Sequence, residues 1–290
     1  MKNKRKNKIL FLCLTILVLL VLCSRINKKD NSDQEKIVFN KEKLEDIETI
    51  KDLELPEIDK NISYFYHYHS WENYYGTKFS GIFKVPKKFF KSSKFNRENP
   101  EIYTHFELTE QLVYYFLYKN VLSFDEDKLE EITLMFEEIK KKKRLNRVQF
   151  AELIVSSIQA IPYVLISHVP CNECEFYDPS IECMGNVFAG FQSPVEFMSN
   201  FKGDCDTRAL LCFSILQNFG YDVAVLISQV YQHAVLGINL NVGGGDYLKY
   251  KGKRYYAWET TSEGWKAGNL PPEVSKMYYW NINITNDDLK

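Results

Sequence analysis

The sequence predicts an α+β domain, preceded by a short apolar segment near the N-terminus. Two patterns support this fold class. Apolar residues recur with a helical period between residues 106 and 219, and strand-like runs follow from residue 223 onward. Helices that come before antiparallel strands are typical of α+β domains.

The composition fits a folded protein with a buried core. Of the 290 residues, 45% are hydrophobic and 26% are charged, a balance typical of globular domains. The net charge is −1, so no global field favours a nucleic-acid partner. We expect no nucleic acid, no cofactor and no resident metal.

The N-terminus predicts a membrane anchor over residues 1–25. Five basic residues precede an uncharged run from Ile9 to Ser24, which as a helix would span roughly 24 Å. The sequence Leu22-Cys23-Ser24 is a poor match to a signal cleavage site or a lipoprotein motif, which leaves these cleaved forms as weaker alternatives. The basic end should stay inside, giving a single-pass protein with its folded part outside the cytoplasm.

Residues 26–60 predict a flexible tether, because they are polar, densely charged and poor in aromatic residues. Residues 61–146 form the predicted N-terminal part of the folded domain. Segment 61–103 is aromatic and broken by Gly and Pro, which indicates short strands and turns. Helices are predicted over 106–120 and 125–143.

Residues 147–290 form the predicted catalytic core. Pro162 ends one helix, Ser193-Pro194 opens a short second one, and Gly220 ends a third. The last two strands should form a hairpin whose turn contains Asp246. The predicted elements are the helices 146–160 and 204–219 and the strands 223–230, 233–240 and 254–261.

Cys205 is the predicted nucleophile. Gly203 permits a tight turn and Asp204 is a good helix cap, which places Cys205 in the first turn of an apolar helix. The positive end of the helix dipole should lower the pKa of the thiol, and the Cys205 amide could bind an oxyanion. A buried, inert cysteine, as expected for Cys212, is the alternative.

A thiol nucleophile needs a base, and His233 lies at the start of an apolar strand. Glu259 ends the neighbouring aromatic strand and could hold the imidazole across the strand pair, with Asp246 as a weaker rival. Gln159 could donate to an oxyanion beside the Cys205 amide. Its alternative role is to cap the last turn of its helix.

Together these motifs resemble the bacterial transglutaminase-like superfamily. The resemblance covers residues 147–270 and implies a papain-like core, with the nucleophile at a helix N-terminus packed on an antiparallel sheet. It also implies a Cys-His-Asp triad, here with Glu259 where most members have aspartate. The matching motifs are Ser157–Tyr163, Gly203-Asp204-Cys205-Asp206, His233-Ala234 and Glu259-Thr260-Thr261.

A second cluster contains Cys171, Cys174 and Cys183. With His168 these cysteines could form a zinc site, but an extracytoplasmic location favours one disulfide among them, with the pairing open.

The predicted function is thiol acyl transfer on amide bonds of a peptide or protein substrate. Resolution of the acyl-enzyme by water would make the protein a cysteine peptidase or amidase, whereas resolution by an amine would make it a crosslinking transglutaminase. The alternative from another class is a catalytically idle binding domain displayed at the membrane.

Overall fold

The computed structural model describes residues 63–101, 108–175 and 177–290. The described residues all belong to one compact unit. The predicted anchor (1–25) and tether (26–60) lie outside the described residues. Within the described ranges, no helix is long and apolar enough to cross a membrane.

The domain opens with a long antiparallel hairpin of β1 (Tyr64–Glu72) and β2 (Lys78–Pro86), followed by α2 (Lys87–Glu98). The sequence predicts only short strands and turns here. Aromatic residues occupy both faces of β1, which hides the alternation that marks a strand. In β2, buried residues alternate with more exposed ones, and Phe79, Phe83 and Val85 are among the buried residues.

Three helices follow, α3 (Glu110–Asp125), α4 (Glu130–Lys143) and α5 (Arg147–Gln159). The helix predicted over 106–120 starts later in the described part of the chain, where the Thr109 side chain accepts from the Leu112 amide, and it extends to Asp125. Asp125 is buried and accepts from Ser93 and from the Val195 amide. Asp125 is the last residue of α3, whereas the sequence predicted that it begins the next helix.

The segment after α5 contains the short parallel pair β3 (Leu165–Ile166) and β4 (Cys183–Met184). Single helical turns, η4 (Cys171–Glu173) and η5 (Phe188–Gly190), flank β4. Helix α6 (Pro194–Asn200) then begins at Ser193, which forms the expected cap together with Glu196. The sequence therefore predicted the start of this helix correctly.

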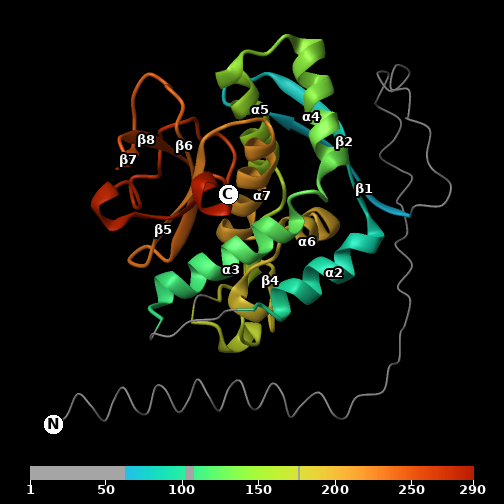
Figure 1. Ribbon diagram of the computed structural model, residues 1–290, viewed down its shortest axis with the longest axis vertical. Helices are drawn as coiled ribbons and strands as arrows, with labels where there is room; N and C mark the ends of the chain where they lie inside the picture. Colours follow the sequence, from blue (N-terminus) through green and yellow to red (C-terminus); the bar gives the residue numbers. More distant parts are fainter. Residues whose placement is uncertain (1–62, 102–107, 176) are drawn as a thin grey trace. The chain divides into compact units, whose positions relative to one another are not determined.

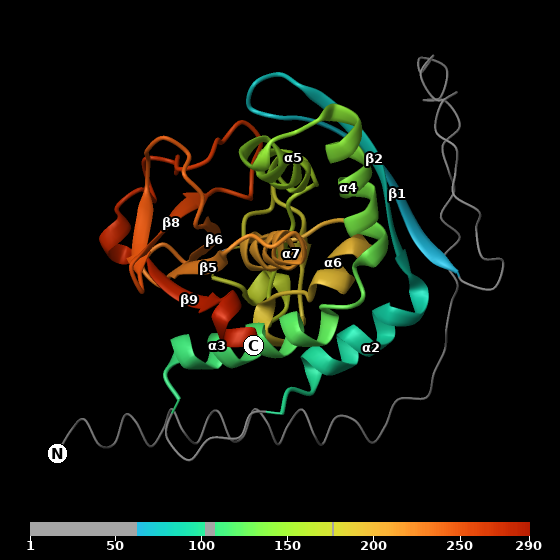
Figure 2. The same ribbon diagram turned by 45° about the horizontal axis from the view of Figure 1, so that its top comes forward.

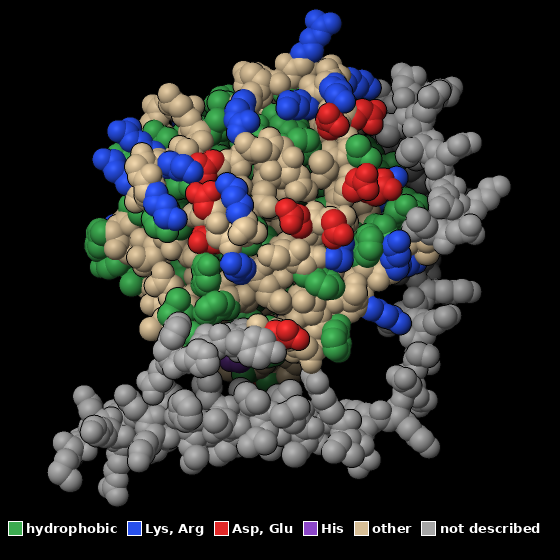
Figure 3. Space-filling model, in the orientation of Figure 1, with side chains coloured by type: hydrophobic (Ala, Val, Ile, Leu, Met, Phe, Trp, Pro, Cys, Tyr) green, Lys and Arg blue, Asp and Glu red, His purple; other side chains and the backbone are tan. Residues whose placement is uncertain are grey.

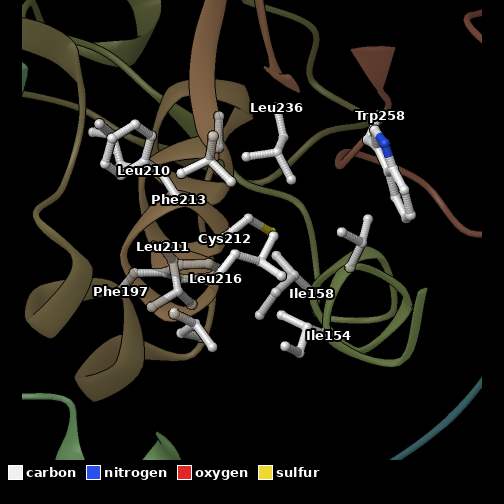
Figure 4. Close-up of a cluster of buried hydrophobic side chains, with 14 of the residues drawn as sticks. Ile154, Ile158, Phe197, Leu210, Leu211, Cys212, Phe213, Leu216, Leu236 and Trp258 are labelled. Atoms are coloured by element: carbon white, nitrogen blue, oxygen red, sulfur yellow. The ribbon is translucent and has the colours of Figure 1, made fainter. Parts of the chain in front are cut away.

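Helix α7 (Cys205–Asn218) lies at the centre of the fold (Figures 1 and 2). It packs against β5 and β6 and against α5 and α6. Figure 4 shows the resulting core, in which Cys212 points among Ile158, Leu236 and Trp258 from other elements. Cys212 is fully buried, as expected of an inert cysteine.

The sheet has the order β7-β8-β6-β5-β9, and all its pairs are antiparallel. The predicted direct hairpin between 233–240 and 254–261 is wrong, because β7 intervenes and pairs with β8 at the edge of the sheet. The pairing of β6 with β8 is nevertheless present, with Leu236 opposite Trp258. The strands are β5 (Val223–Ser228), β6 (His233–Ile238), β7 (Tyr247–Tyr250), β8 (Lys253–Trp258) and β9 (Asn281–Thr285).

The two predicted parts of the folded domain share one hydrophobic core. Phe83 and Phe136 from the first part and Leu210 and Val225 from the second belong to the same buried cluster. On the face in Figure 3, basic and acidic side chains are interspersed, as expected for a net charge of −1.

Candidate active site

The start of α7 places Cys205 at the junction of helix and sheet. The Asp204 carboxylate accepts from the Thr207 amide at 3.1 Å and caps the helix. Gly203 is required before it, since a Cβ there would lie 2.8 Å from Thr207 Cγ2. The Cys205 side chain is 8% exposed, and the Ala234 backbone N–H at the start of β6 faces its sulfur.

His233 and Glu259 form the predicted hydrogen bond. His233 Nε2 lies 3.0 Å from Glu259 Oε2, and Glu259 is 1% exposed. The Trp280 ring packs edge-on against the imidazole, with ring centroids 5.8 Å apart. Because Nε2 is bonded to Glu259, Nδ1 is the ring nitrogen left to exchange a proton with a thiol.

The longer side chain of Glu259 is accommodated by its own turn. Oε1 accepts from the backbone amides of Thr260 and Thr261, each at 2.8 Å, and from Thr261 Oγ1 at 2.7 Å. Burial acts to raise the pKa of Glu259, but the hydrogen bonds from His233 and Thr261 and the charge of His233 leave the pKa below its usual value. The carboxylate is therefore ionised at neutral pH, and His233 Nε2 carries the donated hydrogen.

The expected low pKa of Cys205 is wrong for this structure. Burial raises the pKa of the thiol, and the nearby carboxylates of Asp206 and Asp204 raise it further, while the Ala234 amide acts in the opposite direction. The helix terminus alone favours a thiolate. Here burial and two acids outweigh it, so the resting form is the neutral thiol.

Gln159 lies near the site, in neither predicted role. Its side-chain Nε2 donates to the Glu259 carbonyl at 2.7 Å and to the Trp265 carbonyl at 3.0 Å. Both amide hydrogens are engaged, so they do not point toward an oxyanion. Gln159 instead fixes the backbone of Glu259 to the end of α5.

Arg208 is a site residue that the sequence analysis missed. Its fully buried guanidinium donates to the backbone carbonyls of Ile158 (2.7 Å) and Thr260 (3.1 Å), and Nε donates to Gly203 (2.9 Å). A further hydrogen bond reaches Ile161. The available signal was a lone basic residue in an otherwise apolar helix. Arg208 joins the start of α7, the end of α5 and the turn after Glu259.

Asp246 does not contact His233. Its carboxylate accepts from the Leu270 amide at 3.2 Å. In the described part of the chain, Glu259 is thus the acid bonded to His233 and Asp246 is a turn residue.

The cysteine cluster contains one disulfide, as expected. Cys171 and Cys183 are bonded, with an S–S distance of 2.05 Å, and Cys174 is free. No group of three or more His, Cys, Asp or Glu side chains that could hold a metal ion occurs in the described ranges. The zinc alternative with His168 therefore has no support among these residues.

No family model matches this chain, and no curated protein or solved structure matches it either. The geometry of the site therefore carries the functional argument.

Proposed function

We propose that this protein is a membrane-anchored thiol acyl-transfer enzyme, a transglutaminase-like cysteine peptidase or amidase. Cys205 would be the nucleophile, His233 the base and Glu259 the residue that orients the base. One observation carries the proposal: the partly buried hydrogen bond between His233 and Glu259 is made by the residue that precedes Ala234, whose backbone N–H faces the sulfur of Cys205 at the N-terminus of α7. Nucleophile, base and orienter in this order are the requirements of covalent acyl transfer.

Catalysis would begin from the neutral thiol. As Sγ attacks the amide carbonyl carbon, the S–H bond breaks, the proton moves to His233 Nδ1 and a C–S bond forms. Glu259 stabilises the imidazolium that results. The proton then passes from Nδ1 to the leaving amine, which departs and leaves a thioester on Cys205. This general-base route suits a thiol whose pKa is raised, since it needs no thiolate before substrate binds.

Oxyanion stabilisation would come first from the Cys205 backbone amide. As the first residue of α7, Cys205 presents an N–H that has no partner within its own helix. We propose this donor as half of an oxyanion hole.

Hydrolysis is the simpler outcome, because water can always reach a thioester, and an amine acceptor would give crosslinking instead. The substrate would be a peptide or a protein. The main alternative remains a catalytically idle binding domain. A hydrogen-bonded His–carboxylate pair beside the cysteine supports the enzyme, since a binding domain has no evident need of it.

We also propose that residues 1–25 anchor the protein and that residues 61–290 lie outside the cytoplasm. The disulfide between Cys171 and Cys183 supports this location, because disulfides persist in oxidising compartments. Protease added to intact spheroplasts should release the folded domain, whereas full protection of the domain would refute this topology.

Acyl transfer can be tested without a known substrate. p-Nitrophenyl acetate should acylate Cys205 and release a burst of nitrophenolate equal to the enzyme concentration. Cys205→Ala should abolish the burst and His233→Ala should slow it strongly, while Cys174→Ser, which removes a free cysteine outside the site, should retain it. A burst that persists in Cys205→Ala, or no burst in the wild-type protein, would refute the proposal.

A further inference from the structure

The thiol of Cys205 donates to a carboxylate. Its sulfur lies 3.4 Å from Asp206 Oδ2, which is hydrogen-bonding distance for sulfur. Asp206 is the next residue along the chain and is partly buried. In the resting structure, the thiol proton is therefore shared with an acid that lies outside the proposed triad.

Tyr118 holds that acid in place. The Tyr118 hydroxyl donates to Asp206 Oδ1, the oxygen that does not contact the thiol. Tyr118 is 1% exposed and packs edge-on against Phe191. Because its ring is enclosed on α3, the hydroxyl fixes the carboxylate from an element other than α7.

The surroundings of the thiol are rich in acids and phenols. Asp204 caps α7 and Asp206 lies in its first turn, and both raise the pKa of Cys205. The buried guanidinium of Arg208 is the cation on the same helix, and it is committed to backbone carbonyls. The other titratable groups around the thiol are Tyr114 and Tyr118 on α3, Tyr163 after α5, His233 on β6 and Glu259 after β8.

We propose that Asp206, fixed by Tyr118, is a positioning residue that holds the thiol proton and keeps the nucleophile of the resting enzyme latent. The assignment rests on the function proposed above, in which His233 must take that same proton. For attack to begin, the S–H···O contact to Asp206 is exchanged for one to His233 Nδ1, with no change in redox state. Asp206 thus opposes premature alkylation or oxidation of Cys205.

The test is the rate of alkylation of Cys205 by iodoacetamide as a function of pH, with the modified peptide identified by mass spectrometry. Alkylation requires a thiolate. Asp206→Asn should accelerate alkylation at neutral pH by about tenfold or more. A tenfold change requires the loss of only about a third of the interaction energy of two charges about 4 Å apart at an effective dielectric of 20. The inflection should also move to lower pH.

Two variants make this result specific. Asp206→Glu keeps the charge and should stay slow, as in the wild type. Asp222→Asn is the matched control, since Asp222 accepts from the Tyr255 hydroxyl at 2.8 Å in a second tyrosine–carboxylate pair. Its rate should equal that of the wild type. If Asp206→Asn does not fold, Asp206→Ser decides the question, because it also removes the charge beside the thiol and should raise the rate in the same direction.

An unchanged or slower rate in Asp206→Asn, or in Asp206→Ser where that variant decides, would overturn the inference. Such a result, together with a burst that depends on Cys205, would leave the proposed acyl transfer standing. Accelerated alkylation in a protein without the burst would show that Asp206 suppresses the reactivity of the Cys205 thiol and would refute the enzyme. The two proposals therefore fail separately.

Discussion

Replacing Glu259 by glutamine should abolish most activity while leaving the fold intact. The carboxylate has two roles, carried by its two oxygens: Oε1 accepts from the Thr260 and Thr261 groups, and Oε2 accepts from His233. A glutamine carbonyl can replace Oε1, but its NH2 group would then face His233 Nε2. An NH2 group cannot accept from Nε2–H, so the imidazole must carry its hydrogen on Nδ1. That tautomer has no lone pair at Nδ1 to receive the thiol proton.

The magnitude follows from the distance. Nε2 and Oε2 are 3.0 Å apart, which places the two charge centres slightly further from each other. At about 4 Å and an effective dielectric of 20, an ion pair contributes about 4 kcal/mol. Loss of that interaction in the transition state slows acylation by about 10³-fold, and the wrong tautomer can extend this to about 10⁴-fold. The free energy of unfolding should fall by only about 1–2 kcal/mol, because a single charge-assisted hydrogen bond is lost.

The assay is the rate of the nitrophenolate burst, with urea unfolding as the measure of stability. Asp246→Asn is the control and should change the burst by less than about threefold, since Asp246 is not bonded to His233 and an asparagine oxygen can still accept from the Leu270 amide. The reasoning is refuted if Glu259→Gln reacts within about tenfold of the wild type, a loss of only about 1.4 kcal/mol. A larger effect from Asp246→Asn would refute it equally.

Three further predictions concern stability. The pKa of Glu259 is lower in the folded protein than its usual value, so the ionised carboxylate stabilises the fold above about pH 4.3, and this contribution is lost as pH falls through the folded pKa. The difference in unfolding free energy between wild type and Glu259→Gln should therefore shrink in acid. A difference that stays constant with pH would contradict this prediction. Arg208→Lys should lower the unfolding free energy by about 3 kcal/mol or more, because an ammonium cannot reach every carbonyl that the guanidinium bonds; an unchanged urea midpoint would contradict it. Cys183→Ser should cost about 3 kcal/mol for a disulfide that closes a 12-residue separation, a difference that a reducing agent should abolish.

Local signals explain what the sequence predicted well. Ser193 and Asp204 each cap the helix that follows, and each is recognisable because a capping side chain bonds an amide only three residues away. The cross-strand contact of His233 with Glu259 was also predictable, since both strands have strong β patterns. These features depend on short stretches of chain.

The features that were missed depend on contacts between distant segments. The edge strand β7 is only four residues long, and β9 lies far from the strand that it pairs with, so neither pattern is strong. The pKa of Cys205 was misjudged for a similar reason. The acids Asp204 and Asp206 are its sequence neighbours, but the largest cause of the raised pKa is burial, which comes from elements far along the chain that pack against α7. No local motif encodes that burial.

The guanidinium of Arg208 has a consequence for how the domain unfolds. It bonds the Gly203 turn, the end of α5 and the turn after Glu259, so none of these segments can open locally without leaving buried carbonyl groups without donors. Each buried carbonyl left without a donor adds to the free energy of local opening, which we expect to approach the free energy of global unfolding. The backbone amides of Arg208 and Thr260 should therefore exchange with deuterated water only through global unfolding, at rates that match those of Leu210 and Val225 in the hydrophobic core.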